Sequence, residues 1–334
     1  MPAPSRAVLG LRLFAALFLT LAAIFAVVAR LYFRRYPVSL SAAIGVYTGF
    51  VLYLGLALVP GVEGSRETAR RWLAARPRTP VIAAAACVPY LAYAIGASDF
   101  RWAALVPLAA IAVMLPSLYA WFPVRKPSCF AWQDACVAGL LVFAALSHLL
   151  KGIWNVPVNL DFMARIFLIA VVSWCWVFIR PIPGLGYDLT LTLKALKAAA
   201  LNFSYFAVVA IPAGLALHFI AWNPRWRGLP QFSLDFLTIF LFIALLEEMF
   251  FRGMLQVLIS NSLRSQWAGQ ALVACLFGLF HILHTPFPNW PYVAMAAVAG
   301  WFYGSAFRNG GGLMASALTH AAVDTVWRTF LTKG

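Results

Sequence analysis

The chain has few charged side chains. Asp, Glu, Lys and Arg together make up 10% of its 334 residues, and hydrophobic residues make up 63%. An ordinary soluble domain carries about 25% charged residues, so that class is excluded. Successive apolar runs approach the roughly 20 residues that a helix needs to cross a bilayer. The sequence therefore predicts an all-α, polytopic helical membrane protein.

The apolar runs are separated by short loops rich in Pro, Gly, Asn and Arg. We predict about eleven transmembrane helices, within a range of eight to twelve. Their approximate spans are 8–29, 38–60, 79–97, 102–122, 133–150, 162–179, 199–222, 232–259, 267–285, 290–307 and 311–331.

Several motifs of soluble enzymes are missing. The five cysteines form no Cys-x-x-Cys pair, which argues against a zinc ribbon or a redox pair. The zincin motif His-Glu-x-x-His and the nucleophile elbow Gly-x-Ser-x-Gly are also absent. Any hydrolytic chemistry must then rest on other residues.

Acidic residues are scarcer than basic ones, and the formal charge is +15. In a soluble protein this balance would suggest a nucleic-acid partner. Here the basic residues gather in short loops between apolar runs, as in 66–78, which is the topology signal of membrane proteins. We expect a multi-pass protein of the cell membrane whose partner is the lipid bilayer and not nucleic acid. The oligomeric state is left open.

One break divides the chain. The segment that starts at Arg180 reads Arg-Pro-Ile-Pro-Gly-Leu-Gly, and ionisable side chains inside apolar runs concentrate after it. We therefore predict two parts: N-terminal membrane helices over 1–184, whose role is unassigned, and a part over 185–334 that carries the chemistry.

Only four glutamates occur, and two of them, Glu247 and Glu248, lie inside the membrane-length run 232–259. Ionisable groups at membrane depth are costly and therefore suggest function. On a helix Glu248 and Arg252 are one turn apart on the same face, which predicts an ion pair. Successive residues differ by about 100°, so Glu247 points elsewhere and stays available for chemistry.

Two further motifs follow in the next apolar runs. Phe277-x-x-x-His281 lies in the run 267–285, and His284 follows closer to its end. In the final run, His320 and Asp324 are four residues apart, so the carboxylate can orient the imidazole. Three membrane runs can thus present carboxylates, imidazoles and an arginine to one interior.

This set of side chains fits more than one chemistry. A carboxylate base, histidines and hydrogen-bond donors make a plausible hydrolytic site. Histidine and carboxylate also ligate metals, which leaves a metal-dependent protease open. A transporter or channel is a further alternative, since buried ionisable groups also form ion paths. A transporter would distribute polar groups over both halves of the chain, whereas here they cluster in one.

The three motifs together resemble the CPBP family, which comprises type II CAAX prenyl proteases and bacteriocin-processing proteins and is also called Abi. The family pattern is Glu-Glu-x-x-x-Arg, then Phe-x-x-x-His, then His-x-x-x-Asn or Asp. The matching residues here are Glu247, Glu248, Arg252, Phe277, His281, His320 and Asp324. The resemblance covers about residues 185–334 and implies an intramembrane protease core.

The resemblance implies a glutamic-type intramembrane endopeptidase without a cofactor or metal. Glu247 and His281 would activate water, and His320 with Asp324 would stabilise the oxyanion. Glu248 and Arg252 would support the site. Since an ionised aspartate cannot donate a hydrogen bond, we expect Asp324 to orient His320. The implied substrate is a membrane-associated protein tail or leader, and we expect a bacterial C-terminal sorting signal and a bacterial inner membrane.

Overall fold

The computed structural model describes residues 6–154 and 156–333, almost all of them in helices. The chain divides into two units. Unit 1 comprises residues 1–127 and 131–181, and unit 2 comprises residues 128–130 and 182–334. The all-α prediction is confirmed. The only strands within the described residues are two of three residues each.

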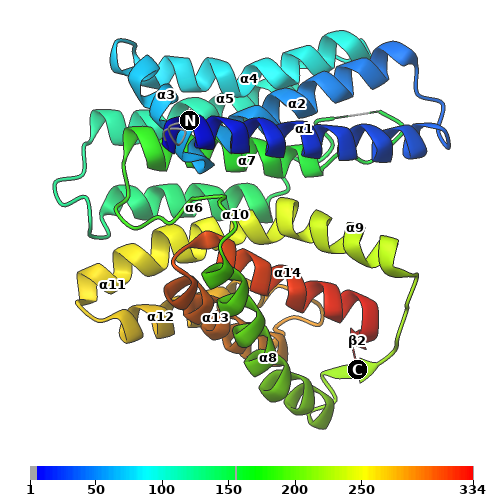
Figure 1. Cartoon of the computed structure of the whole chain (residues 1–334), viewed down its shortest axis with the longest axis vertical. Helices are drawn as coiled ribbons and strands as arrows, with labels where there is room; N and C mark the ends of the chain where they lie inside the picture. Colours follow the sequence, from blue (N-terminus) through cyan, green and yellow to red (C-terminus); the bar gives the residue numbers. More distant parts are fainter. Residues whose placement is uncertain (1–5, 155, 334) are drawn as a thin grey trace, which may run out of the picture. The chain divides into compact units, whose positions relative to one another are not determined.

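Within its described residues, unit 1 is built from seven α-helices and one short π-helix, and Figure 1 labels the α-helices. They are α1 (Arg6–Phe33), α2 (Leu40–Gly61), α3 (Glu63–Ala74), α4 (Arg78–Ala97), α5 (Trp102–Trp121), α6 (Trp132–Leu146), α7 (Phe162–Trp174) and the π-helix η1 (Cys175–Ile179). Helix α3 is polar and was not among the predicted runs. It fills the basic connection between the apolar helices α2 and α4.

Glycines allow α2 and α4 to pack backbone to backbone. A Cβ atom on Gly45 would meet the carbonyl oxygen of Tyr93 at 2.8 Å, and one on Gly96 would meet the amide nitrogen of Gly45 at 2.8 Å. Both distances are too short for a real side chain. Small residues are used in this way at membrane helix contacts, where van der Waals packing replaces the hydrophobic effect.

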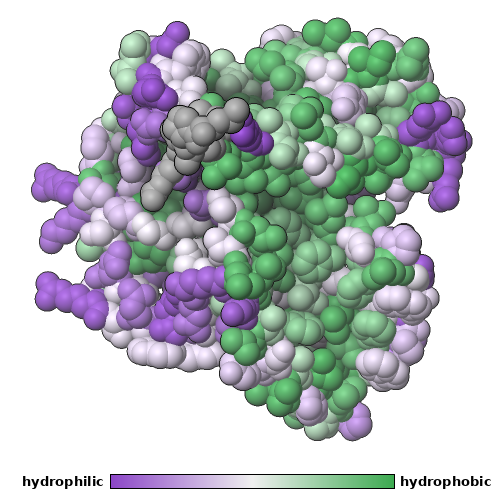
Figure 2. Space-filling model, in the orientation of Figure 1, coloured by the Kyte–Doolittle hydropathy of each residue, from purple (hydrophilic) through white to green (hydrophobic). Residues whose placement is uncertain are grey.

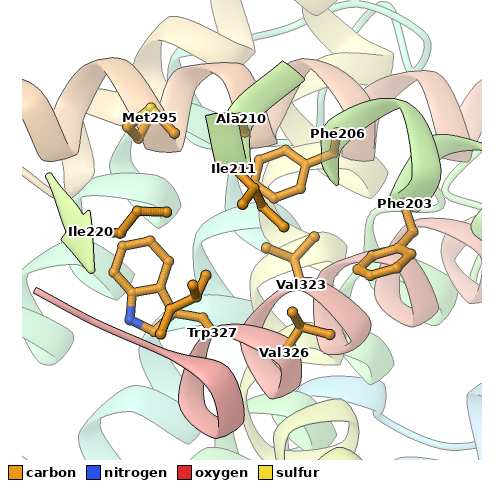
Figure 3. A pocket seen from close by; sticks show the side chains of 10 residues that line it. Phe203, Phe206, Ala210, Ile211, Ile220, Met295, Val323, Val326 and Trp327 are labelled. Carbon is orange, nitrogen blue, oxygen red and sulfur yellow. The ribbon is translucent and has the colours of Figure 1, made fainter. Parts of the chain in front are cut away.

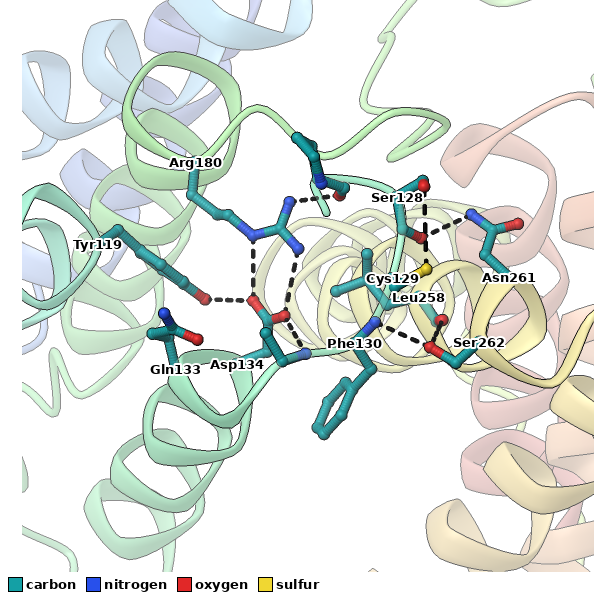
Figure 4. Close-up of polar contacts among 12 residues, drawn as sticks. Tyr119, Ser128, Cys129, Phe130, Gln133, Asp134, Arg180, Leu258, Asn261 and Ser262 are labelled. Carbon is teal, nitrogen blue, oxygen red and sulfur yellow. Dashed lines mark hydrogen bonds and ion pairs between the residues drawn. The ribbon is translucent and has the colours of Figure 1, made fainter. Parts of the chain in front are cut away.

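A buried ion pair between Arg180 and Asp134 joins the C-terminal end of unit 1 to α6 (Figure 4). Arg180 donates through Nε and Nη2 to the two oxygens of Asp134, at 3.3 and 3.2 Å, and Tyr119 donates to the same carboxylate at 2.8 Å. Arg180 also donates to the carbonyl of Pro127 at 2.6 Å. The predicted break therefore begins with a buried arginine whose charge is compensated within unit 1.

Unit 2 contains all the ionisable motifs. Its elements are α8 (Leu193–Ala216), β1 (Ile220–Trp222), α9 (Leu229–Ile239), η2 (Phe240–Ala244), α10 (Leu245–Glu248), η3 (Met249–Gln256), α11 (Val257–Leu263), α12 (Gln266–Phe280), α13 (Trp290–Gly310), α14 (Leu313–Phe330) and β2 (Leu331–Lys333). The short segment 128–130 joins this unit. Asn261 donates to the carbonyl of Ser128, and the amide of Phe130 donates to Ser262, both in Figure 4.

The elements from α9 to α11 form one continuous helix, Leu229–Leu263, of 35 residues. At about 1.5 Å per residue it is roughly 50 Å long, more than the roughly 30 Å of bilayer hydrocarbon. Its two π-helical stretches, η2 and η3, flank the glutamates on α10. π-Helical turns inside α-helices are frequent at functional sites.

Helix α14 packs against both this long helix and α8, and α13 packs against α8, α12 and α14 (Figure 1). After α14 the strand β2 pairs antiparallel with β1, with Trp222 opposite Leu331. Unit 2 thus brings α10, α12, α13 and α14 together, and α10, α12 and α14 carry or shortly precede the motif residues.

Within the described residues, seven helices are long and apolar enough to cross a membrane. They are Leu9–Phe33, Leu40–Gly61, Arg78–Ala97, Trp102–Trp121, Phe162–Ile179, Leu193–Ala216 and Leu229–Leu263. Four predicted runs differ: α6 and α12 have only 15 residues each, and α13 and α14 are not among these seven. The prediction of a polytopic membrane protein is confirmed with fewer clear spans than the expected eleven.

The surface agrees with a membrane environment. Apolar side chains cover broad areas of the face seen in Figure 2. Large hydrophobic side chains are exposed on the predicted spans, including Leu19 on α1 and Val208 on α8, which are 65% and 74% exposed. Such exposure would be unfavourable in water and is expected where lipid tails surround the helix. The chain is a multi-pass membrane protein.

Candidate active site

Glu248 lies at the centre of a buried polar cluster. It is fully buried on α10, and its Oε1 atom accepts two hydrogen bonds. Arg252 Nη1 donates one at 2.9 Å, from the following turn, and His320 Nδ1 donates the other at 2.9 Å, from α14. The predicted pair of Glu248 and Arg252 is therefore present. The contact with His320 was not anticipated from the sequence.

Arg252 is also fully buried and has a second anchor. Its Nη2 atom donates to the carbonyl of Gly300 on α13 at 2.9 Å. The guanidinium lies 4.6 Å from the ring centre of Phe277 and 5.3 Å from that of Tyr303. A buried charge is tolerated only when it is paired and hydrogen-bonded. Nη1 and Nη2 have such partners, whereas Nε has none among the described residues. The arginine thus links the long helix to α12 and α13.

His320 lies between two carboxylates. Its Nδ1 faces Glu248, and its Nε2 lies 3.5 Å from Oδ2 of Asp324, one turn further along α14. An imidazole can donate to carboxylates on both sides only when both nitrogens carry a proton. The geometry therefore favours the imidazolium form. The ring is stacked on Tyr303, with centroids 4.6 Å apart and planes 14° apart, which fixes its orientation.

Glu247 differs from its neighbour in exposure. It is half-buried, whereas Glu248 is completely enclosed. Its charge interacts electrostatically with Arg252 and with the Tyr292 hydroxyl. Two adjacent glutamates thus have unequal surroundings, as the 100° rotation between successive helix residues requires.

His281 is the first residue beyond α12. Its Nδ1 lies 2.8 Å from the carbonyl oxygen of Phe277. Because a carbonyl oxygen only accepts hydrogen bonds, Nδ1 carries the proton, and Nε2 of the neutral ring is an acceptor. Burial lowers the pKa of His281, and the neighbouring His284 and His320 add to this effect. The neutral ring with a basic Nε2 is the form that burial favours.

The second and third motifs meet around Phe277. Its ring centre lies 4.8 Å from that of His281 and 5.9 Å from that of His320. Asp324 also interacts electrostatically with His281. The structure therefore gathers the residues of all three motifs in one part of unit 2.

Sequence reasoning missed the support that α13 gives to this cluster. Three of its carbonyls accept hydrogen bonds from side chains: Gly300 from Arg252, Trp301 from Gln270, and Gly304 from Gln256. The only available signal was the presence of buried glutamines inside apolar runs, which need partners. The partners themselves are backbone atoms and leave no mark in the sequence.

Among the residues that the structure describes, no three His, Cys, Asp or Glu side chains converge as metal ligands would. Glu248 and His320 are instead engaged with each other and with Arg252.

A small apolar cavity lies beside α14 (Figure 3). Val323 and Val326, which flank Asp324 in sequence, line it together with Phe203, Phe206 and Ile220. With a volume of about 20 Å³, the cavity holds about one water molecule and is too small for a polypeptide segment.

Comparison with known proteins agrees with the motifs. Residues 229–326 match the family model described as type II CAAX prenyl endopeptidase Rce1-like. This segment of unit 2 is therefore similar to Rce1-like endopeptidases. The match covers all three motifs and confirms the resemblance predicted from them. No curated protein and no solved structure matches the chain significantly.

The Rce1-like match implies a class of reaction. The matched family is described as an endopeptidase family, which implies peptide hydrolase activity for the chain. Together with the apolar helices, the match supports an intramembrane endopeptidase. The matched segment begins where the long helix begins, at residue 229, and ends within α14. Unit 1 lies outside it.

Proposed function

We propose that the protein is a glutamic-type intramembrane endopeptidase that cleaves a membrane-anchored protein tail or leader, with a bacterial C-terminal sorting signal as the expected substrate. The main evidence for this proposal is that the two glutamates have unequal environments. Glu248 is buried and accepts from Arg252 and His320, whereas Glu247 remains half-buried at the edge of the same cluster. We assign the chemistry to Glu247 and the support to Glu248.

In this mechanism Glu247 and His281 together activate water. Nδ1 of His281 is committed to the carbonyl of Phe277, so Nε2 accepts a hydrogen bond from the water while the carboxylate of Glu247 takes its proton. The water oxygen then attacks the scissile carbonyl carbon, and the proton held by Glu247 passes to the leaving amine. The carboxylate is regenerated, and no further reactant is required.

The oxyanion of the tetrahedral intermediate would be stabilised from α14. His320 is held as a donor by Glu248 on one side and oriented by Asp324 on the other. The 3.5 Å distance to Asp324 is long for a hydrogen bond, so Nε2 can shift its donation to the oxyanion. Donors that are in place before the reaction are worth several kcal/mol in the transition state.

The substrate class follows from the surroundings of the site. It lies in a multi-pass membrane protein, which suits a polypeptide segment already held in the membrane. We expect the bacterial inner membrane as the location. The role of residues 1–184 is not assigned by this proposal.

The test uses purified full-length protein in detergent and a synthetic membrane-tail peptide with a reporter. We expect Glu247→Ala and His281→Ala each to abolish cleavage while thermal unfolding stays close to that of the wild type. The control is Trp267→Leu, an exposed ring at the start of α12. Wild-type cleavage in both site variants would contradict the mechanism. Loss of activity with a chelator, together with metal bound to the pure protein, would favour the metal-dependent alternative.

A further inference from the structure

The ring of His281 needs more support than the preceding helix, α12, provides. It lies just after the last residue of α12, so no following helical turn encloses it. Its single hydrogen bond, from Nδ1 to the carbonyl of Phe277, fixes one atom of the ring. One fixed atom leaves the ring plane free to tilt, and the tilt decides where the Nε2 lone pair points.

Tyr292 supplies the missing constraint. Its ring is stacked on His281, with centroids 5.2 Å apart and planes 15° apart. It is also stacked on His284 at 4.5 Å and 20°, and the two imidazoles lie 5.6 Å apart at 20°. The three rings are nearly parallel. Offset stacking is a favoured arrangement for aromatic rings, so each ring limits the tilt of the other two.

Tyr292 is itself held from several directions. Its amide donates to the side chain of Asn289, the N-cap of α13, at 3.0 Å. Phe219 packs edge-on against its ring at 5.6 Å, and Trp327 on α14 lies 6.2 Å away. A ring anchored by α13, α14 and Phe219 forms a rigid surface. The position of α14, which carries His320 and Asp324, is thereby coupled to the plane of His281.

We propose that Tyr292 is a positioning residue whose ring, through stacking, sets the plane of His281 and thus the direction of its Nε2 lone pair. The inference rests on the proposed function, because it gives Tyr292 a role only if His281 orients the attacking water. The ring carries this role, and the hydroxyl is not required for it.

The experiment compares Tyr292→Phe with Tyr292→Leu in the full-length protein, using the same tail peptide. Phenylalanine keeps the flat ring, so we expect wild-type cleavage within about twofold. Leucine fills space without a flat face, and we expect kcat to fall roughly 10- to 100-fold with KM nearly unchanged, because small errors in placement are costly. If the leucine variant fails to fold, Tyr292→Met replaces it. Trp267→Leu, which removes a stacked pair with Trp301, is the matched control.

A second readout separates positioning from general damage. Burial lowers the pKa of His281, and the groups facing it are His284, His320 and Asp324. Removing the ring admits water, so in Tyr292→Leu the acidic limb of the activity profile should move to higher pH. In Tyr292→Phe it should stay in place. Mere destabilisation would lower the amount of active protein without moving the limb.

The outcomes are distinguishable. Equal loss in the phenylalanine and leucine variants would overturn the stacking role, and so would wild-type kcat in the leucine variant. If His281→Ala is inactive while Tyr292→Leu is normal, only this inference fails. If His281→Ala cleaves normally, the proposed function itself fails, whatever the Tyr292 variants do.

Discussion

His320 Nδ1 donates to Glu248 Oε1 at 2.9 Å and joins two residues that are 72 positions apart in the chain. The same oxygen accepts from Arg252 at the same distance. Glu248 therefore joins the long helix to α14 and compensates two cationic donors at once. This arrangement makes the second glutamate a structural centre and leads to different expectations for the two neighbouring acids.

Glu248→Gln should destabilise the protein more than Glu247→Gln. Removing one partner of a buried ion pair leaves an uncompensated charge and costs about 3–5 kcal/mol. Glu247 is half-buried, and its loss should cost about 1 kcal/mol or less in stability.

Cleavage should still fall about 100-fold or more in Glu247→Gln, because the proposed proton acceptor is lost. Thermal unfolding and cleavage measured on the same preparations check both parts. A Glu247→Gln variant that melts as early as Glu248→Gln would contradict the assignment.

Asp324→Asn tests whether the carboxylate orients His320. Without the carboxylate the imidazole of His320 loses its orienting charge, and small errors in placement are costly, so we expect kcat to fall roughly 10- to 100-fold. The asparagine is nearly the same size, and folding should be retained. Cleavage assays on the folded variant provide the measurement. Activity close to that of the wild type would show that no carboxylate is needed at this position.

The pH dependence of cleavage should reflect the protonation of the buried His281 ring. The ring must be neutral for Nε2 to accept a hydrogen bond, so activity is lost when the ring is protonated. Burial lowers its pKa below the ordinary value of 6.5. The acidic limb of kcat/KM should therefore lie below pH 6.5, and activity should persist where a free histidine would already be charged. An acidic limb at or above 6.5 would argue against His281 as the titrating group.

Gly300→Ala should disturb the site through packing. A Cβ atom there would meet Arg252 Nη2, the ring of Phe277 and the Cα atom of Ala274, each at 3.2 Å. Overpacking of this kind costs about 1–3 kcal/mol and would push the guanidinium away from Glu248. We expect a lower melting temperature and reduced cleavage.

The matched control for that variant is Gly139→Ala. Gly139 lies within α6, and a Cβ atom there would have nothing within 4 Å. Alanine is favoured over glycine inside a helix, so this change should be neutral or stabilise the protein by about 0.5–1 kcal/mol. If both alanine variants behave alike, the crowding at Gly300 has no particular effect.

The local part of this site could be predicted from the sequence. The pair of Glu248 and Arg252 and the contact of His320 with Asp324 both join residues four apart, and helix geometry alone places such residues together. The membrane class followed from composition for a similar reason, since hydrophobic run length reflects bilayer thickness. The match over residues 229–326 then confirmed the family resemblance.

The non-local part could not be predicted. The hydrogen bond from His320 to Glu248 depends on how α14 packs against the long helix, and a single sequence does not contain that information. The π-helical stretches Phe240–Ala244 and Met249–Gln256 lie in an ordinary apolar run without glycine or proline at their starts. The short helices α6 and α12 were predicted as full spans because apolar composition continues beyond their ends.

Three backbone carbonyls of α13 accept side-chain hydrogen bonds, and together they resist translation of α13 along its axis. Gly300 and Gly304 are one turn apart, and they bind Arg252 and Gln256, which are also one turn apart on the neighbouring helix. Displacing α13 along its axis by a single residue would break both bonds and the one from Gln270 simultaneously. The apolar surfaces of membrane helices offer little resistance to such translation, because lipid and side chain are equally apolar. These hydrogen bonds therefore define one axial position of α13 relative to the helices that carry Arg252, Gln256 and Gln270.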